Sequence, residues 1–527
     1  MDIGARNLPI RRRAFLSGAA GTVAAVAAPG CAPAPDSDVP GGLLPAIGPF
    51  PSGIASGDPR PDGTIIWTHA APPTRGGSVE VDWVLATDPQ LKNVVRRGSV
   101  TTTSSADHMV KVRIDGLASG GRYHYGFSTA RGPSATGIAR TAPDPDDDSV
   151  EELRIAFGSC HDFTFGYGTA LRGIAQEGAD LMVWLGDYLY PPADLRPVAP
   201  DVSAFLYQRR DPDWQAMCEA GPVLWMCDDE VTNNYDRLTN PADVERWFRD
   251  FLRYFPYESP DPADPLRTWR RLEWGRLAEL HCLESRRYRD AAIPQGLSPN
   301  SSGLGLVSAD QGRSMLGAEQ FGWLSAGLRR STRPWHVLCN QLMMMHWRVL
   351  DLEEPFWRFF FPDAPPNHGI YANFDQWDGY AVERRRLLEL IRDEVAGDVV
   401  VISGDTHLHF NGSLVVDPDA AVPERVAVEV LPGSLSAASA DGWFGGITPA
   451  SRYLTDIASA ALVGQNPHLD YVNLLDHGYG LMTITPEETT IEIKLVDVRR
   501  PDAVPRVAVR YRLRPGSHRL ERVPLSG

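Results

Sequence analysis

Three short apolar runs, each followed by a small residue and a polar side chain, constrain the fold of this chain most. The runs span residues 153–157, 180–185 and 398–402. Such runs are typical of strands that are covered on both faces, as in α/β sheets. Helical periodicity appears at residues 242–254, 317–328 and 379–394, and strand patterning returns over 426–512. The alternation predicts an α/β domain over about 150–515.

The residues directly after the three runs are of metal-ligating types. They read Gly-Ser-Cys-His at 158–161, Gly-Asp-Tyr-Leu-Tyr at 186–190 and Gly-Asp-Thr-His-Leu-His at 404–409. Glycine lets the chain turn sharply, and sites in α/β proteins gather beyond the carboxyl ends of strands. We therefore expect one site that contains Cys160, Asp187, Tyr190, Asp405 and His407.

The chemistry of these side chains indicates two kinds of metal ion. Thiolate, phenolate and imidazole suit a Lewis-acidic transition metal such as ferric iron, whereas carboxylate and amide oxygens suit calcium. A carboxylate between the two ions could bridge them. Taken singly, each residue has a plainer role, such as an inert buried thiol for Cys160, a turn for Asp187 or a surface histidine for His407 or His409. Their combination after buried strands favours the metal interpretation.

Residues 49–143 follow a different pattern, with short alternating runs that turn residues separate. These runs lie at 63–67, 79–84, 110–114 and 123–127. Alternation with a period of two is typical of strands with one buried face. The segment predicts an immunoglobulin-like or fibronectin-like β-sandwich, joined to the α/β domain by a Pro- and Asp-rich linker. The whole chain is thus expected to be α/β (α+β).

The N-terminus has the features of an export signal. Arg11, Arg12 and Arg13 precede a small apolar run at 19–28, which is shorter than the ~20 residues of a membrane-spanning helix. We expect residues 1–33 to be a signal for the twin-arginine translocation machinery and residues 34–48 to be a linker. A coincidental basic N-terminus is the alternative. The expected location is periplasmic or extracellular.

Two further features concern the environment of the exported protein. Cys31 follows small residues and is a candidate lipid anchor, with simple cleavage nearby as the alternative. The other cysteines of the chain number five, so in an oxidising compartment at least one stays unpaired or binds metal. The formal net charge of −16 argues against a nucleic-acid partner, because no basic field neutralises the phosphates. An anionic substrate would need a local positive charge, which bound cations supply.

The sequence resembles the PhoD-like family of alkaline phosphatases and phosphodiesterases. The matching stretches include Gly-Asp-Pro at 57–59, Gly-Ser-Cys at 158–160, Leu-Gly-Asp-Tyr-Leu-Tyr at 185–190, Glu-Val-Thr-Asn-Asn-Tyr at 230–235, Met-Leu-Gly-Ala-Glu-Gln at 315–320, Gly-Asp-Thr-His at 404–407 and Asn-Pro-His at 466–468. They occur in family order and cover nearly the whole chain after the signal. The resemblance implies a fibronectin-like domain followed by a metallophosphatase α/β sandwich.

The resemblance also implies the ions and their ligands. Ferric iron (Fe3+) would be held by the residues Cys160, Asp187, Tyr190 and His407. Calcium (Ca2+) would be held by Asp187, Asn233 and Asp405, where Asn233 is chosen over its neighbour Asn234. Asp187 would serve both ions.

One segment departs from the family pattern. Residues 227–230 read Cys-Asp-Asp-Glu, where the family usually has Asp-Asp-His-Glu. Either a deletion removed the histidine or Asp229 stands in its place, and the loss could reduce activity or alter substrate choice. Arg286 is a candidate phosphate contact, with a surface ion pair as the alternative.

The expected function is hydrolysis of a phosphoric ester by metal-activated hydroxide, with Asp187, Asn233, Asp405 and His407 at the reacting centre. No nucleophile elbow surrounds Ser159, so a covalent serine intermediate is not expected. A phosphodiesterase or phospholipase D-like activity at the same site is one alternative. A degenerate metal-binding homologue with low turnover is another.

Overall fold

The computed structural model describes residues 46–74, 76–190, 203–228, 235–291, 312–351, 359, 369–371, 375–418, 420 and 422–525. The predicted signal, Cys31, most of the predicted linker, and Asn233 lie outside these residues. No helix of the described part is long and apolar enough to cross a membrane.

A large mixed sheet forms one layer of the molecule. In the described residues its strand order is β24-β23-β22-β21-β9-β10-β11-β1-β2-β5. Its strands are β24 (Glu521–Val523), β23 (Arg506–Leu513), β22 (Thr489–Val496), β21 (His477–Ile484), β9 (Leu153–Gly158), β10 (Leu181–Trp184), β11 (Val223–Trp225), β1 (Ile54–Arg60), β2 (Gly63–His69) and β5 (Met109–Asp115). At its centre β9, β10 and β11 run parallel, so their carboxyl ends lie at one edge.

A second sheet packs against the first. Its order is β12-β13-β14-β17-β19-β18-β20. The strands are β12 (Arg270–Trp274), β13 (Ala278–Cys282), β14 (Trp335–Cys339), β17 (Asp398–Ile402), β19 (Arg425–Pro432), β18 (His409–Val415) and β20 (Leu469–Asn473). Neighbours from β13 to β19 run parallel. Buried side chains of both sheets, among them Ile155, Val183, Val337 and Val400, form the core between them.

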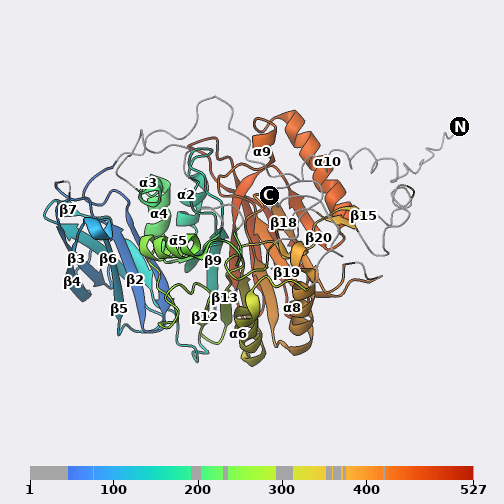
Figure 1. Cartoon of the computed structure of the whole chain (residues 1–527), viewed down its shortest axis with the longest axis horizontal. Coiled ribbons are helices and arrows are strands. Elements are labelled where there is room, and N and C mark those ends of the chain that lie inside the picture. Colours follow the sequence, from blue (N-terminus) through green and yellow to red (C-terminus); the bar gives the residue numbers. More distant parts are fainter. Residues whose placement is uncertain are drawn as a thin grey trace.

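Helices cover the two outer faces, which explains why the central strands are apolar on both sides. Side chains of α2 (Thr169–Gln176), α4 (Pro212–Ala220) and α5 (Pro241–Tyr254) join the core on the outer face of the first sheet. Those of α6 (Gly317–Arg330), α8 (Ala381–Glu394) and α10 (Pro449–Gln465) do so on the second sheet. The α/β architecture is therefore confirmed (Figure 1).

Apart from the strands of the N-terminal sandwich, the remaining described elements are short. They are η1 (Ser104–Ala106), α3 (Ala204–Gln208), η3 (Trp377–Tyr380), α9 (Ala440–Trp443), and a hairpin of β15 (Arg348–Asp351) and β16 (Gly369–Tyr371).

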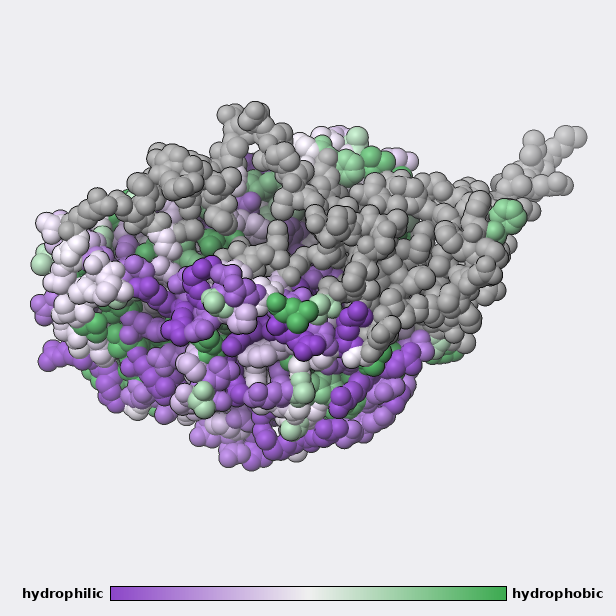
Figure 2. Space-filling model, in the orientation of Figure 1, coloured by the Kyte–Doolittle hydropathy of each residue, from purple (hydrophilic) through white to green (hydrophobic). Residues whose placement is uncertain are grey.

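Hydrophilic residues dominate the described part of the face in Figure 2, and apolar residues occur there only in small separate groups.

The N-terminal β-sandwich is also confirmed, but one of its sheets is not separate. Strands β3 (Val79–Ala86), β4 (Val94–Thr102), β6 (Arg122–Thr129), β7 (Gly132–Pro133) and β8 (Gly137–Arg140) form a sheet of their own. Facing it, β1, β2 and β5 continue the large sheet, because β1 pairs with β11 at Gly57 and Val223. A Cβ atom on Gly57 would lie 2.5 Å from the Pro256 carbonyl oxygen, so this close approach requires glycine.

The expected strand patterning over 426–512 is wrong for the part between β19 and β20. There the chain forms α9 and α10. Pro449 occupies the first turn of α10, and Thr448 and Ser451 form a reciprocal capping box. These are helix-starting signals that the apolar pattern alone did not reveal.

Candidate metal centre

The candidate ligands lie on tight turns after two strands of the first sheet and one strand of the second. Cys160 follows β9, Asp187 follows β10, and Asp405 and His407 follow β17. All four have left-handed backbone conformations, with φ of 62°, 53°, 63° and 59°. Such values are uncommon for residues other than glycine, and this strain is found mostly where side chains serve a function. The turns thus hold the four candidate side chains in costly but fixed directions.

Cys160, Asp187 and His407 form the first group of ligands. One ligand atom of each residue lies within 4.8 Å of the others. The Tyr190 hydroxyl donates to Asp187 Oδ2 at 2.5 Å and lies 2.9 Å from His407 Nε2. His407 Nδ1 is 2.7 Å from the Ala438 carbonyl oxygen. If Nδ1 donates to that carbonyl, Nε2 is left to face the group, as is usual for metal-binding histidines.

Asp187, Asp228 and Asp405 form a second group, again within 4.8 Å of one another. Asp187 belongs to both groups, which is the geometry that a bridging carboxylate needs. Asp228 was not predicted as a ligand. Its signal in the sequence is weak, because Asp228 lies three residues beyond the end of β11, and the pairing of β11 with β10 is known only from the sheet order. The sequence around Asp228 departs from the family pattern by its missing histidine.

Arg286 lies inside the second group. Its guanidinium donates at 2.5 Å to the carboxylates of Asp228, Asp375 and Asp405. The side chain is fully buried. The alternative of a surface ion pair is therefore wrong, because three acidic groups surround this cation in the interior. Such an arrangement fixes the carboxylates in place before any ion arrives.

Gln376 completes the surroundings of Asp405, since its side-chain amide donates to Asp405 Oδ2. Burial raises the pKa of Asp405 above its ordinary value, even though Arg286 acts in the opposite sense. The pKa of Asp375 is lowered, because Arg289 and Arg286 outweigh the effect of its burial. The positive charge of Arg286 is thus shared among carboxylates of unequal acidity.

The ionisation of the first group follows from burial and pairing. Burial raises the pKa of the Cys160 thiol well above its ordinary value, and the charge of Asp187 adds to this. Burial would also raise the pKa of Asp187, but His407 and Tyr190 outweigh it, and that pKa is lowered. Burial would lower the pKa of His407, but Asp187 reverses the direction. A bound cation would release the protons of the thiol and the imidazole.

The two groups fit metal ions. Asp187 Oδ1 is buried and has no hydrogen-bond partner among the described residues, so a carboxylate oxygen is left for another ligand. Thiol, phenol and imidazole around it suit a transition metal, and the three carboxylates suit a harder cation. The side chains of His407 and Asp405 remain 24% and 15% exposed, so a substrate could reach the group at these residues.

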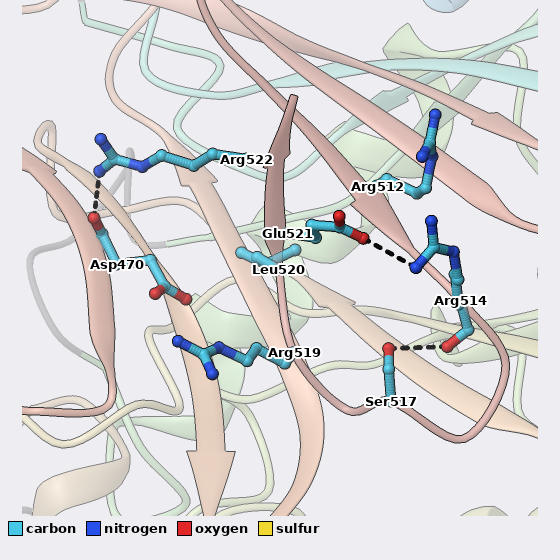
Figure 3. Close-up of a pocket in the computed structure, with 8 residues that line it drawn as sticks. All are labelled: Asp470, Arg512, Arg514, Ser517, Arg519, Leu520, Glu521 and Arg522. Atoms are coloured by element: carbon cyan, nitrogen blue, oxygen red, sulfur yellow. Dashed lines mark hydrogen bonds and ion pairs between the residues drawn. The ribbon is translucent and has the colours of Figure 1, made fainter. Parts of the chain in front are cut away.

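A cavity of about 510 Å³ lies elsewhere, between the β23–β24 turn and β20. Figure 3 shows the side chains of Arg512, Arg514, Arg519 and Arg522 around it. The backbone N–H of Gly516 in this turn donates to Asp398 at the start of β17, whereas the candidate ligands follow the end of β17. This cavity is thus at the opposite end of the strand and does not belong to the metal centre.

Comparison with known proteins identifies the family. A family model described as PhoD-like phosphatase matches residues 155–493, and one described as its N-terminal domain matches residues 43–143. The chain belongs to the PhoD-like phosphatase family. As a PhoD-like phosphatase it is a phosphoric ester hydrolase, which confirms the resemblance seen in the sequence.

Two relatives of this PhoD-like phosphatase cover most of its length. Alkaline phosphatase D of Bacillus subtilis (strain 168) is 30% identical over 485 residues, which make up 85% of this chain and 78% of the relative. A solved structure described as the structure of PhoD superposes with a TM-score of 0.74 at 26% identity, covering 91% of this chain and 93% of that chain. The similarity thus includes both the sandwich and the α/β domain.

Proposed function

We propose that this PhoD-like phosphatase is an exported, metal-dependent hydrolase that takes ferric iron in the first group and calcium in the second. The shared position of Asp187 is the observation that carries the proposal. Cys160, Tyr190 and His407 would complete the iron ligands. Asp405 and Asn233 would bind calcium together with Asp187, and Asp228 is near enough to take part.

When bound, the two cations supply the positive charge that holds the phosphate and activates the attacking water. The residues of the chain keep the reacting parts in position. Cys160 and Asp187 are buried and exclude bulk water from one side of the centre. Asp405 and His407 lie at its exposed side, where they meet the ester. Arg286 holds Asp405 in one orientation and adds a positive charge beside the phosphate position.

The two metal groups serve monoesters and diesters alike, because the wall of the pocket makes the distinction. Residues 229–234, which include the position of the missing histidine, lie outside the described part of the chain. We favour phosphomonoester hydrolysis by analogy with the relative called alkaline phosphatase D.

The experiment compares p-nitrophenyl phosphate with bis-p-nitrophenyl phosphate on protein whose iron and calcium contents have been measured. Faster hydrolysis of the monoester supports the proposal. Preference for the diester supports the phosphodiesterase or phospholipase D-like alternative. No hydrolysis of either ester by fully loaded protein supports the degenerate, low-turnover homologue.

A further inference from the structure

A second cluster of ligating side chains lies in the interior, on strands that do not carry the candidate centre's ligands. Glu279 and His281 on β13 and His336 on β14 bring ligand atoms within 4.8 Å of one another. Glu279 and His336 are direct neighbours in the parallel pairing of the two strands. All three side chains are almost completely buried.

The strand alternation places this cluster on the outer face of the second sheet. On β13 the intervening residues Ala278 and Leu280 point into the core between the sheets, so Glu279 and His281 point the other way. Helix α6 packs over that face, and the ring of its Trp323 lies 6.0 Å from the ring of His281. The cluster is therefore enclosed between β13, β14 and α6.

The histidines of this cluster have ring nitrogens that the fold does not satisfy. Neither nitrogen of His281 has a hydrogen-bond partner among the described residues, and the same holds for Nδ1 of His336. His336 Nε2 lies 3.1 Å from the Ala396 carbonyl oxygen. If Nε2 donates its proton to that carbonyl, Nδ1 keeps an unshared electron pair that can bind a metal ion, as in metal-binding histidines. Buried polar atoms without partners call for a ligand or a water.

Burial keeps both imidazoles neutral. It lowers the pKa of His281 well below the ordinary value, and His336 and Arg271 act in the same direction. Burial also lowers the pKa of His336, in spite of the hydrogen bond to Ala396. Neutral imidazole is the form that binds a metal ion, so no proton has to be displaced from these ligands.

The charges around the cluster select the class of ion. Arg271 Nε lies 2.5 Å from Glu279 Oε1, and Arg333 lies 3.4 Å from Glu279 Oε2. Arg333 also pairs with Glu273 at 3.0 Å. Because these guanidinium groups already offset the carboxylate, calcium, which depends on carboxylate charge, would gain little here. An ion that bonds strongly to neutral imidazole nitrogen fits better.

We propose that Glu279, His281 and His336 form a structural site for a borderline transition-metal ion of the zinc class, which links β13 to β14 beneath α6. Two imidazoles and one carboxylate are a common ligand set for zinc. The chain after β13 leads directly to Arg286, so the ion would also steady the strand that carries this arginine to the candidate centre. The proposal does not depend on which ions the candidate centre takes.

The test measures zinc bound per chain by mass spectrometry after dialysis against trace zinc. A Cys160→Ser background weakens the first group, so that it contributes less to the measurement. In this background we expect one zinc per chain, and its loss in both His281→Gln and His336→Gln. His468→Gln is the matched control. His468 is a buried histidine directly before β20, and β20 is the edge strand at the other end of the sheet from the cluster. We expect that variant to keep its zinc.

Cobalt spectra of the same background give a second measurement that does not need the variants to fold. A bound Co2+ ion with nitrogen and oxygen ligands should give visible d–d bands. These bands should disappear when added zinc displaces the cobalt. Equal zinc in the background protein and both histidine variants would overturn the proposal. Equal loss in His468→Gln, or a cobalt spectrum identical to that of free Co2+, would also overturn it.

Discussion

Among single residues, Asp187 is the most important for the proposed metal centre. This side chain belongs to both ligand groups, accepts a hydrogen bond from Tyr190 and keeps one buried oxygen without a partner in the described structure. Asp405 belongs to the second group alone. The two residues are therefore not equivalent, although each follows a Gly after a buried strand.

We expect Asp187→Asn to lower kcat/KM for p-nitrophenyl phosphate by more than about a hundredfold, since losing a partner outside the ligand shell already costs ten- to a hundredfold. Asp405→Asn should cost less, because it disturbs only one ion. Metal content measured on both variants separates loss of the ion from loss of rate. A clearly larger effect of Asp405→Asn would show that Asp187 does not bridge.

Asp229 is the residue at which the sequence departs from its family. If it has replaced the usual histidine, Asp229→His should raise turnover, because a group that transfers a proton contributes about a hundredfold or more. If a deletion removed the histidine, insertion of histidine between Asp229 and Glu230 should raise turnover instead. Iron content should stay constant in both constructs. If neither alters hydrolysis while both keep their metal, the departure is without effect.

At the scale of elements, the join between the sandwich and the α/β domain depends on a glycine. A Cβ atom at position 57 would lie 2.5 Å from the Pro256 oxygen and 2.9 Å from the Val223 oxygen. We expect Gly57→Ala to lower the free energy of unfolding by about 1–3 kcal/mol through overpacking. Gly464→Ala in α10 is the control, because its Cβ would meet nothing within 4 Å.

Denaturant unfolding of both variants measures the effect. Gly464→Ala should leave stability unchanged or raise it slightly, since alanine favours a helix more than glycine does. Equal stability of Gly57→Ala and the wild type would mean that β1 and β11 separate without cost.

The sequence predicted the elements that carry their own local signal. Runs 153–157, 180–185 and 398–402 correspond to β9, β10 and β17. Strands that are covered on both faces need apolar side chains on both, so their sequence alone reveals them. The strand-end rule then brought Cys160, Asp187, Tyr190, Asp405 and His407 together. Asn233 stays a prediction, since it lies outside the described residues.

The features that sequence reasoning missed depend on contacts between distant segments. Arg286 is buried because the segment after β13 lies beside Asp228, Asp375 and Asp405. These three residues are far apart in the chain. The join at Gly57 and the position of Asp228 among the ligands likewise cannot be predicted without knowing which strands pair. The predicted domain limits of 49–143 and 150–515 stay predictions, although the family models match similar ranges.

At the scale of the whole molecule, buried histidines couple stability to pH. Burial lowers the pKa of His346 to about 4 and that of His468 to about 3. Unfolded histidine titrates near 6.5, so the unfolded chain binds more protons between these values. Their stabilising contribution is therefore complete above about pH 6.5 and is lost as the pH falls toward the folded values.

Burial raises the pKa of Glu429 to about 7 and that of Asp211 to about 6, and these groups act in the opposite sense. The test is therefore the difference between wild type and His468→Gln, measured by denaturant unfolding at pH 7 and at pH 4.5. We expect the variant to lose less stability on acidification, by up to about 3 kcal/mol. Parallel curves would show that His468 does not titrate on unfolding.

The N-terminal arginines offer a test of export. Changing Arg12 and Arg13 to lysine should keep the protein in the cytoplasm, because the twin-arginine machinery reads this pair. Cell fractionation followed by immunoblotting measures the distribution. Unchanged delivery outside the cytoplasm would remove the twin-arginine interpretation and leave the hydrolase assignment intact.

The most direct test of the metal centre is the metal content and visible spectrum of the wild type beside Tyr190→Phe. We expect iron and calcium in the wild type, with a visible absorption band from the Tyr190 phenolate on ferric iron. Tyr190→Phe should lose this band while it keeps iron on Cys160, Asp187 and His407. A colourless, iron-free wild type that still hydrolyses phosphate esters would contradict the proposed iron site.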